Sequence, residues 1–185
     1  MKKIIHTIAE EVAQVLSQTD EKEVIQLSEE IQSAKRVFIA GTGRSGLIGK
    51  VFAMRLMQSG YPVFVVGETV TPSIQSDDLL LLISGSGNTA SLAQFGRKAK
   101  EIQAKLALVT TNKDSEIGRI SDCLVTIPAA TKKREKHEPD TIQPLGSQFD
   151  QSAHLVLDAL MVYLLQNSSN QQSNADLNNV HANLE

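Results

Sequence analysis

Residues 37–46, VFIAGTGRSG, join a short apolar run directly to a loop of glycines and hydroxyl side chains. Further apolar runs follow along the chain, at residues 63–66, 79–83, 106–109 and 124–127. These runs do not alternate with polar residues, which is typical of strands covered on both faces. The intervals 41–62 and 84–105 are long enough for crossover helices. We therefore predict five strands in a parallel α/β sandwich.

The predicted sheet occupies residues 35–127, and the remaining segments precede or follow it. Residues 1–34 carry apolar side chains at helical spacing and predict two helices, with a break near residues 17–20. Residues 128–146 are polar and charged without periodicity and are expected to form a solvated loop. Residues 147–166 are apolar on more than one face, so this helix should be buried on two sides, partly against another subunit. Residues 167–185 read as a polar tail.

Length, composition and charge exclude several classes of protein for this chain. The chain has 185 residues, of which 41% are hydrophobic, so a single domain with its own core is expected. A formal charge of −3 is too balanced for a dedicated nucleic-acid or membrane-surface binder. One cysteine, Cys123, excludes an internal disulfide framework and a cysteine-rich zinc site. The first residues lack the pattern of a secretion signal and no run is long enough to span a membrane, so a cytoplasmic location is expected.

Two loops of similar character follow predicted strands, at residues 41–46 and 84–89. In one parallel sheet such loops converge on a single crevice, where backbone amides and helix N-termini favour an anion. The hydroxyls that suit phosphate oxygens belong to Ser45, Ser84, Ser86 and Thr89. In the alternative interpretation, the glycines serve tight turns and Ser86 or Asn88 is an ordinary helix cap. Together the two loops favour an anionic ligand.

The first loop also has the spacing G-x-G-x-x-G. Glu68 lies where a dinucleotide-binding fold keeps its ribose-binding acid, so a nicotinamide-dependent dehydrogenase is one candidate. That fold gives no reason for the second loop at residues 84–89. The dehydrogenase hypothesis therefore ranks last.

Five segments together resemble the sugar isomerase (SIS) domain family. They are GTGRSG at 41–46, FAMRL at 52–56, GETVTP at 67–72, SGSGNT at 84–89 and PLGSQFD at 144–150. The resemblance implies a single SIS domain over residues 1–185, with a five-stranded parallel sheet flanked by helices as a flavodoxin-like three-layer sandwich. It also implies a sugar phosphate as the ligand. With such a ligand, residues of both loops are expected to hold the sugar phosphate, together with Glu68, whose segment at 67–72 closes a sheet edge beside the loops. The expected binding residues are Gly43, Arg44, Ser45, Glu68, Ser84, Gly85, Ser86, Gly87, Asn88 and Thr89.

Within that family the sequence is most similar to the 6-phospho-3-hexuloisomerases, because of the segments at 67–72 and 144–150 and the ending HANL at 181–184. This similarity implies interconversion of 3-hexulose 6-phosphate and fructose 6-phosphate, in formaldehyde fixation by the ribulose monophosphate pathway. It also implies a homotetramer with sites near subunit interfaces, and neither cofactor nor metal. The alternative is a regulatory SIS domain that binds a sugar phosphate without catalysis.

Moving a carbonyl from carbon 3 to carbon 2 requires a base, a stabilised enediolate and return of the proton. Asp150 is the candidate base, at a position where the family pattern usually has glutamate. The competing interpretation is a helix cap, because Ser147-x-x-Asp150 has capping-box spacing and a helix N-terminus lowers the pKa of a carboxyl group. His181 is the second catalytic candidate, as a proton shuttle that could reach a neighbouring subunit. A solvated tail histidine is the simpler alternative.

Overall fold

A computed structural model describes residues 1–136, 138–167 and 174–180. Its centre is a five-stranded sheet in the order β2-β1-β3-β4-β5, with every neighbouring pair parallel. The strands are β1 (Val37–Gly41), β2 (Val63–Val65), β3 (Leu79–Ile83), β4 (Lys105–Thr110) and β5 (Cys123–Thr126). The predicted parallel α/β sheet is therefore confirmed, and its strand order is that of the flavodoxin-like folds.

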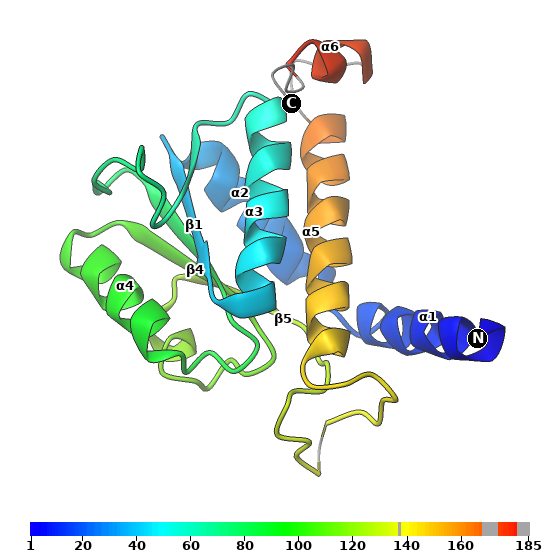
Figure 1. The fold of residues 1–185 in the computed structure, drawn as a ribbon. Coiled ribbons are helices and arrows are strands. Elements are labelled where there is room, and N and C mark those ends of the chain that lie inside the picture. The colour runs from blue at the N-terminus through cyan, green and yellow to red at the C-terminus, as the bar shows by residue number, and fades with distance from the viewer. Residues whose placement is uncertain (137, 168–173, 181–185) are drawn as a thin grey trace.

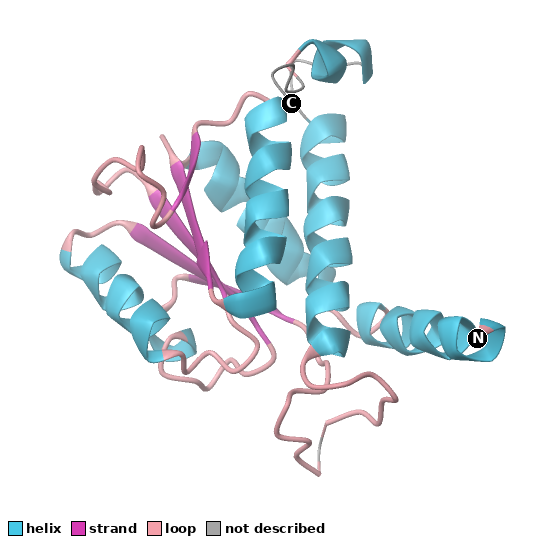
Figure 2. Cartoon of the chain, in the orientation of Figure 1, coloured by secondary structure: helices cyan, strands magenta, loops and turns pink. Residues whose placement is uncertain are grey.

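The strands are uninterrupted apolar runs because both faces of the sheet are covered. Along β3, Leu79, Leu81 and Ile83 belong to one apolar cluster. The intervening Leu80 and Leu82 belong to the other. Figure 2 shows the sheet between its two helical layers, with α4 on one side and α3 and α5 on the other. The fold thus has three layers, and its core fills the space on both faces of the sheet.

The helices account for the remaining regular structure. They are α1 (Lys2–Leu16), α2 (Glu21–Ser33), α3 (Gly43–Gln58), α4 (Ala90–Glu101), α5 (Ser147–Asn167) and α6 (Asn174–Asn179), with a short 3₁₀ turn, η1, at Gly118–Ile120. The break between α1 and α2 falls at the predicted place, and Asp20 caps α2 by accepting a hydrogen bond from the backbone N–H of Lys22. A short helix, α6, lies within the stretch predicted only as a polar tail.

Two features place the outer elements around the sheet. Helices α3 and α5 pack side by side, whereas α1 extends away from the body of the molecule (Figure 1). The long loop, described at residues 128–136 and 138–146, lies between β5 and the start of α5, at the same end of the molecule as the start of α3 (Figure 1). No helix within the described ranges is both long enough and apolar enough to cross a membrane.

Candidate functional site

The two glycine loops leave adjacent strands at the same edge of the sheet. β1 pairs with β3 in parallel, and Gly41 lies opposite Ile83 at their carboxyl ends. The chain proceeds from β1 outward to β2 and then returns to β3 on the other side of β1. Ligands of open α/β sheets bind at this kind of switch point, outside the carboxyl ends of the strands. The loops at 42–46 and 84–89 therefore converge, as the sequence predicts.

Glycine is required in the first loop because strand and helix nearly touch there. A Cβ added to Gly46 would lie 2.7 Å from the backbone oxygen of Gly41, so only glycine allows this approach. Gly43, at φ +57°, begins α3 in the left-handed region. Thr42 is the N-cap of α3, and its side chain makes no capping hydrogen bond. The first turn of α3 therefore presents its amides without a side-chain cap.

The second loop is held by its own hydroxyl groups. Ser84 Oγ accepts a hydrogen bond from the Gly87 backbone N–H at 3.2 Å and lies 3.3 Å from Thr89 Oγ1. Asn88 Oδ1 accepts from the backbone N–H of Glu116 at 2.9 Å, which ties the loop to residues beyond β4. The N-cap of α4 is Thr89, again without a side-chain cap bond. The alternative that Ser86 or Asn88 caps this helix is therefore wrong.

A cavity of 670 Å³ lies between these loops and the segment before α5. Residues predicted from the sequence to form the site and found in its lining are Arg44, Ser45, Ser84, Gly85, Ser86, Asn88, Thr89 and Asp150. Phe149 forms part of the wall and packs against Gly85, where an added Cβ would lie 3.2 Å from the ring. The cavity thus brings together the two loops and the carboxylate of Asp150, which lies 105 residues after Ser45 in the chain.

Asp150 is the buried acid of this cavity. Its side chain is 9% exposed. One carboxylate oxygen accepts a hydrogen bond from Ser45 Oγ at 3.0 Å, and the other forms an ion pair with Arg44 Nε at 3.1 Å. Burial raises the pKa of Asp150 above its ordinary 3.8, and the hydrogen bond from Ser45 and the charge of Arg44 only partly oppose this. The site therefore holds an ionisable acid with a raised pKa, which is the property that a general base requires near neutral pH.

The capping box considered for the start of α5 is not formed. The Ser147 hydroxyl accepts a hydrogen bond from Arg44 Nη1 at 2.9 Å, and the Asp150 carboxylate is directed to Ser45 and Arg44. The backbone N–H of Asp150 donates instead to the carbonyl of Gly146. The pKa of Asp150 is raised and not lowered, because burial outweighs the hydrogen bond from Ser45 and the charge of Arg44. Arg44 instead links the start of α3 to the start of α5.

Comparison with known proteins identifies the family. The SIS domain family matches residues 30–154, which include both glycine loops and Asp150. The chain belongs to the SIS domain family. A 3-hexulose-6-phosphate isomerase from Mycobacterium gastri is 39% identical over 178 residues, covering 96% of this chain and 88% of that protein. The 3-hexulose-6-phosphate isomerase of Bacillus subtilis is 41% identical over 145 residues, which is 78% of this chain and 78% of that protein.

A solved structure supports the same relationship. A protein from Methanococcus jannaschii, whose crystal structure led to an inferred function as 3-hexulose-6-phosphate isomerase, is 29% identical. Its TM-score is 0.85, and the match covers 100% of both chains. The five-stranded parallel sheet and its flanking helices therefore belong to the SIS fold, which the family match assigns to residues 30–154.

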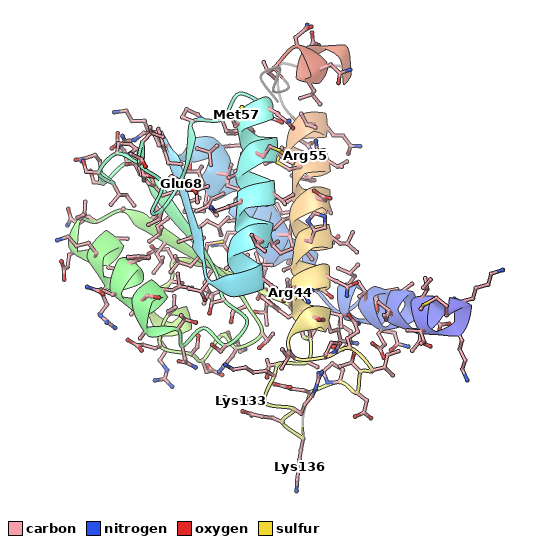
Figure 3. The ribbon with its side chains drawn as sticks, viewed as in Figure 1. Arg44, Arg55, Met57, Glu68, Lys133 and Lys136 are labelled. Atoms are coloured by element: carbon pink, nitrogen blue, oxygen red, sulfur yellow. The ribbon has the colours of Figure 1, made fainter. Side chains whose placement is uncertain are left out.

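Not every predicted site residue lines the SIS cavity. Glu68 pairs with Lys50 on α3 at 2.6 Å, and both side chains are about half exposed. Figure 3 shows Glu68 away from Arg44, which sits at the start of α3. Gly43 and Gly87 shape their loops without lining the cavity, and Gly87 at φ +62° leaves no room for a Cβ against Ser115. His181 lies outside the described residues.

The structure also adds residues to the SIS cavity that sequence reasoning assigned to a solvated loop. Lys132 and Lys133 belong to a charged run without periodicity, yet both line the cavity. Leu145 lines it too, and its φ of +54° is unusual for a residue with a Cβ. The one available signal was that this run belongs to the loop that leads into the segment 144–150. Among the residues described, no group of three metal-ligating side chains comes together.

Proposed function

We propose that this protein is an isomerase that interconverts 3-hexulose 6-phosphate and fructose 6-phosphate. The observation that carries the proposal is the position of Asp150, a buried acid with a raised pKa in the wall of a cavity built from two hydroxyl-rich loops. Relatives of this name align with nearly the whole chain. In this reaction carbon 2 of the sugar is oxidised while carbon 3 is reduced, so the reaction needs no external oxidant or cofactor.

The phosphate group of the substrate would bind between the two glycine loops. There the helices α3 and α4 begin without side-chain caps, so their first-turn amides are available to an anion. Ser86 and Thr89 add hydroxyl donors on the cavity wall. Lys132 and Lys133 bring positive charge from the facing loop. This combination suits a doubly charged phosphate and orients the sugar towards Asp150.

Asp150 would act as the base. From 3-hexulose 6-phosphate it takes the proton on carbon 2, which leaves a 2,3-enediolate, and the proton returns to carbon 3 to give fructose 6-phosphate. Burial raises the pKa of Asp150, which makes the carboxylate a stronger base than an exposed aspartate. The residue is one methylene shorter than the glutamate of the family pattern. The start of α5 would therefore have to approach the substrate more closely.

Arg44 and Ser45 would hold the base in place. Ser45 donates a hydrogen bond to one oxygen of Asp150 and Arg44 forms an ion pair with the other, so the carboxylate is fixed in one orientation. The Arg44 side chain is 59% exposed, so it can contact both Asp150 and a ligand in the cavity. Its fixed positive charge would stabilise the developing enediolate. We keep His181 as the proposed carrier of the proton between the two substrate oxygens, from the same or a neighbouring subunit.

The assembly and the cellular role belong to the same proposal. Helices α3 and α5 pack side by side and carry large apolar side chains that are exposed in the single chain: Leu47, Met54, Met57, Leu155, Val162 and Tyr163. A patch of this kind favours burial against further copies of the chain, in a homotetramer. The proposed setting is the cytoplasm, in formaldehyde fixation by the ribulose monophosphate pathway.

A coupled assay tests the proposal. 3-Hexulose 6-phosphate is generated enzymically, and fructose 6-phosphate is measured as it forms. We expect turnover by the wild-type protein and at least a hundredfold less by Asp150→Asn at equal concentration. A folded protein that binds 3-hexulose 6-phosphate without converting it would support the regulatory alternative instead.

A further inference from the structure

The cavity loop, residues 128–136 and 138–146, has no regular secondary structure, yet it supplies Lys132 and Lys133 to the cavity wall. A segment without helix or strand bonds is placed by the contacts of its side chains and its ends. At its beginning, the backbone N–H of Ala130 donates to Oε1 of Gln148 on α5 at 2.8 Å. Figure 3 shows Lys133 below Arg44, at the same end of the molecule. The position of this loop therefore sets where its two lysines stand.

The other end of the cavity loop is held by an acid on the first helix. Glu11 accepts three hydrogen bonds from it: from Thr141 Oγ1 at 2.5 Å, from the Ile142 backbone N–H at 2.8 Å and from Gln143 Nε2 at 3.0 Å. Burial alone would raise the pKa of Glu11. These three bonds and the charge of Arg134 outweigh burial and hold the pKa below its ordinary 4.5. The carboxylate is therefore ionised at neutral pH and binds the loop as an anion.

This contact continues to the helix that carries the proposed base. Gln143 is buried at 2% exposure, and its Oε1 accepts from Nε2 of Gln151 at 2.6 Å. Its backbone carbonyl accepts from the Arg134 guanidinium in the middle of the same loop. Gln151 is the neighbour of Asp150 on α5. Glu11 thus lies at the start of a chain of hydrogen bonds that ties α1, the cavity loop and the N-terminal part of α5 together.

We propose that Glu11 is a positioning residue for the substrate site, holding the cavity loop so that Lys132 and Lys133 face a bound sugar phosphate. This inference rests on the proposed function in taking the cavity as the site of a sugar phosphate. Glu11 lines no part of the cavity and touches no reacting atom. Its effect is expected on ligand affinity, through the loop, and not on the proton transfer.

The first test is limited trypsin digestion of the full chain without substrate, because the loop carries exposed cleavage sites at Lys132, Lys133 and Arg134. In Glu11→Gln the amide keeps one acceptor oxygen but loses the charge, so at least one charge-assisted bond is lost. We expect cleavage after these residues, followed by mass spectrometry, to speed up about tenfold. The matched control is Glu10→Gln, since Glu10 lies beside it on α1 and pairs only with the exposed His6 in the residues described. The control should be cleaved at the wild-type rate.

The second test measures affinity and turnover on the same two variants. In Glu11→Gln, the Kd for fructose 6-phosphate by calorimetry and the KM for 3-hexulose 6-phosphate should both rise about fivefold to tenfold, with kcat within about twofold of wild type. The inference would be overturned if trypsin cleaved Glu11→Gln at the wild-type rate. It would also be overturned if the variant were cleaved faster but kept the wild-type Kd for fructose 6-phosphate. Digestion and calorimetry require no turnover, so they judge the role of Glu11 even if the isomerase proposal fails. A melting temperature within a few degrees of wild type excludes general unfolding as the cause.

Discussion

Replacing Asp150 by asparagine separates a catalytic acid from a structural one. The substitution keeps the size of the side chain and an oxygen that can accept from Ser45, while it removes the proton affinity that a base needs. General-base catalysis typically contributes a factor of about 10² to 10⁴, so kcat in the coupled assay should fall by at least about a hundredfold. The Kd for fructose 6-phosphate should stay within about threefold, because the proposed phosphate contacts lie on the two glycine loops.

The stability of Asp150→Asn should change little, although its activity falls. Burial raises the pKa of Asp150, so the ionised carboxylate is less favourable in the folded protein than in the unfolded chain at neutral pH. Stability from this group therefore increases as pH falls through the raised pKa, and a neutral asparagine removes the cost of burying the charge. The lost ion pair with Arg44 offsets part of this gain, and we expect a melting temperature within about 4 °C of wild type. A stable variant with near-normal kcat would refute the assignment of Asp150 as the base.

Three further predictions concern Arg44, the phosphate site and the assembly of the protein. Arg44→Gln removes a positive charge that lowers the pKa of Asp150, so the acid limb of the pH profile of kcat/KM should move to higher pH. The control variant Arg55→Gln should leave the acid limb in place. An unmoved limb would mean that Asp150 does not set it. Ser86→Ala should raise KM about tenfold through one lost bond to phosphate, with little change in kcat. Equal KM values for wild type and variant would count against the phosphate placement. Sedimentation should find a tetramer or at least a dimer, and Val162→Glu on the exposed face of α5 should weaken it. A monomer at micromolar concentration would contradict the proposed assembly.

The sheet could be predicted from the sequence because each strand is recognised from a few consecutive residues. Each strand, from Val37–Gly41 to Cys123–Thr126, is an apolar run that needs no partner to be recognised, and the intervals between the runs leave room for helices. The convergence of the two glycine loops followed from parallel strands, since their carboxyl ends share one edge. The same rule led to Glu68 as a neighbour of the site, but its carboxylate pairs with Lys50 instead. The place of Glu68 at the edge of the sheet does not determine which way its side chain points.

The contacts that were not predictable join residues far apart in the chain. Ser45 and Asp150 are separated by 105 positions, and Glu11 and Ile142 by 131. No periodicity or spacing records such a pair, because it depends on how α1, α3 and α5 pack around the sheet. The capping-box pattern at Ser147 and Asp150 was a plausible local interpretation that these tertiary contacts overrode. Likewise, the charged run at residues 132–136 is unremarkable in sequence, and only the fold brings its lysines to the cavity.

The most direct test of the proposed function is an NMR experiment in D₂O that starts from 3-hexulose 6-phosphate and the wild-type protein. The proposed mechanism forms a 2,3-enediolate and reprotonates it at carbon 3. Fructose 6-phosphate should therefore appear, with solvent deuterium at carbon 3 to the extent that the proton held by Asp150 exchanges with D₂O before it returns. Asp150→Asn should give neither product nor label at a comparable rate. A folded wild-type protein that binds 3-hexulose 6-phosphate and leaves it unconverted and unlabelled would contradict the proposal.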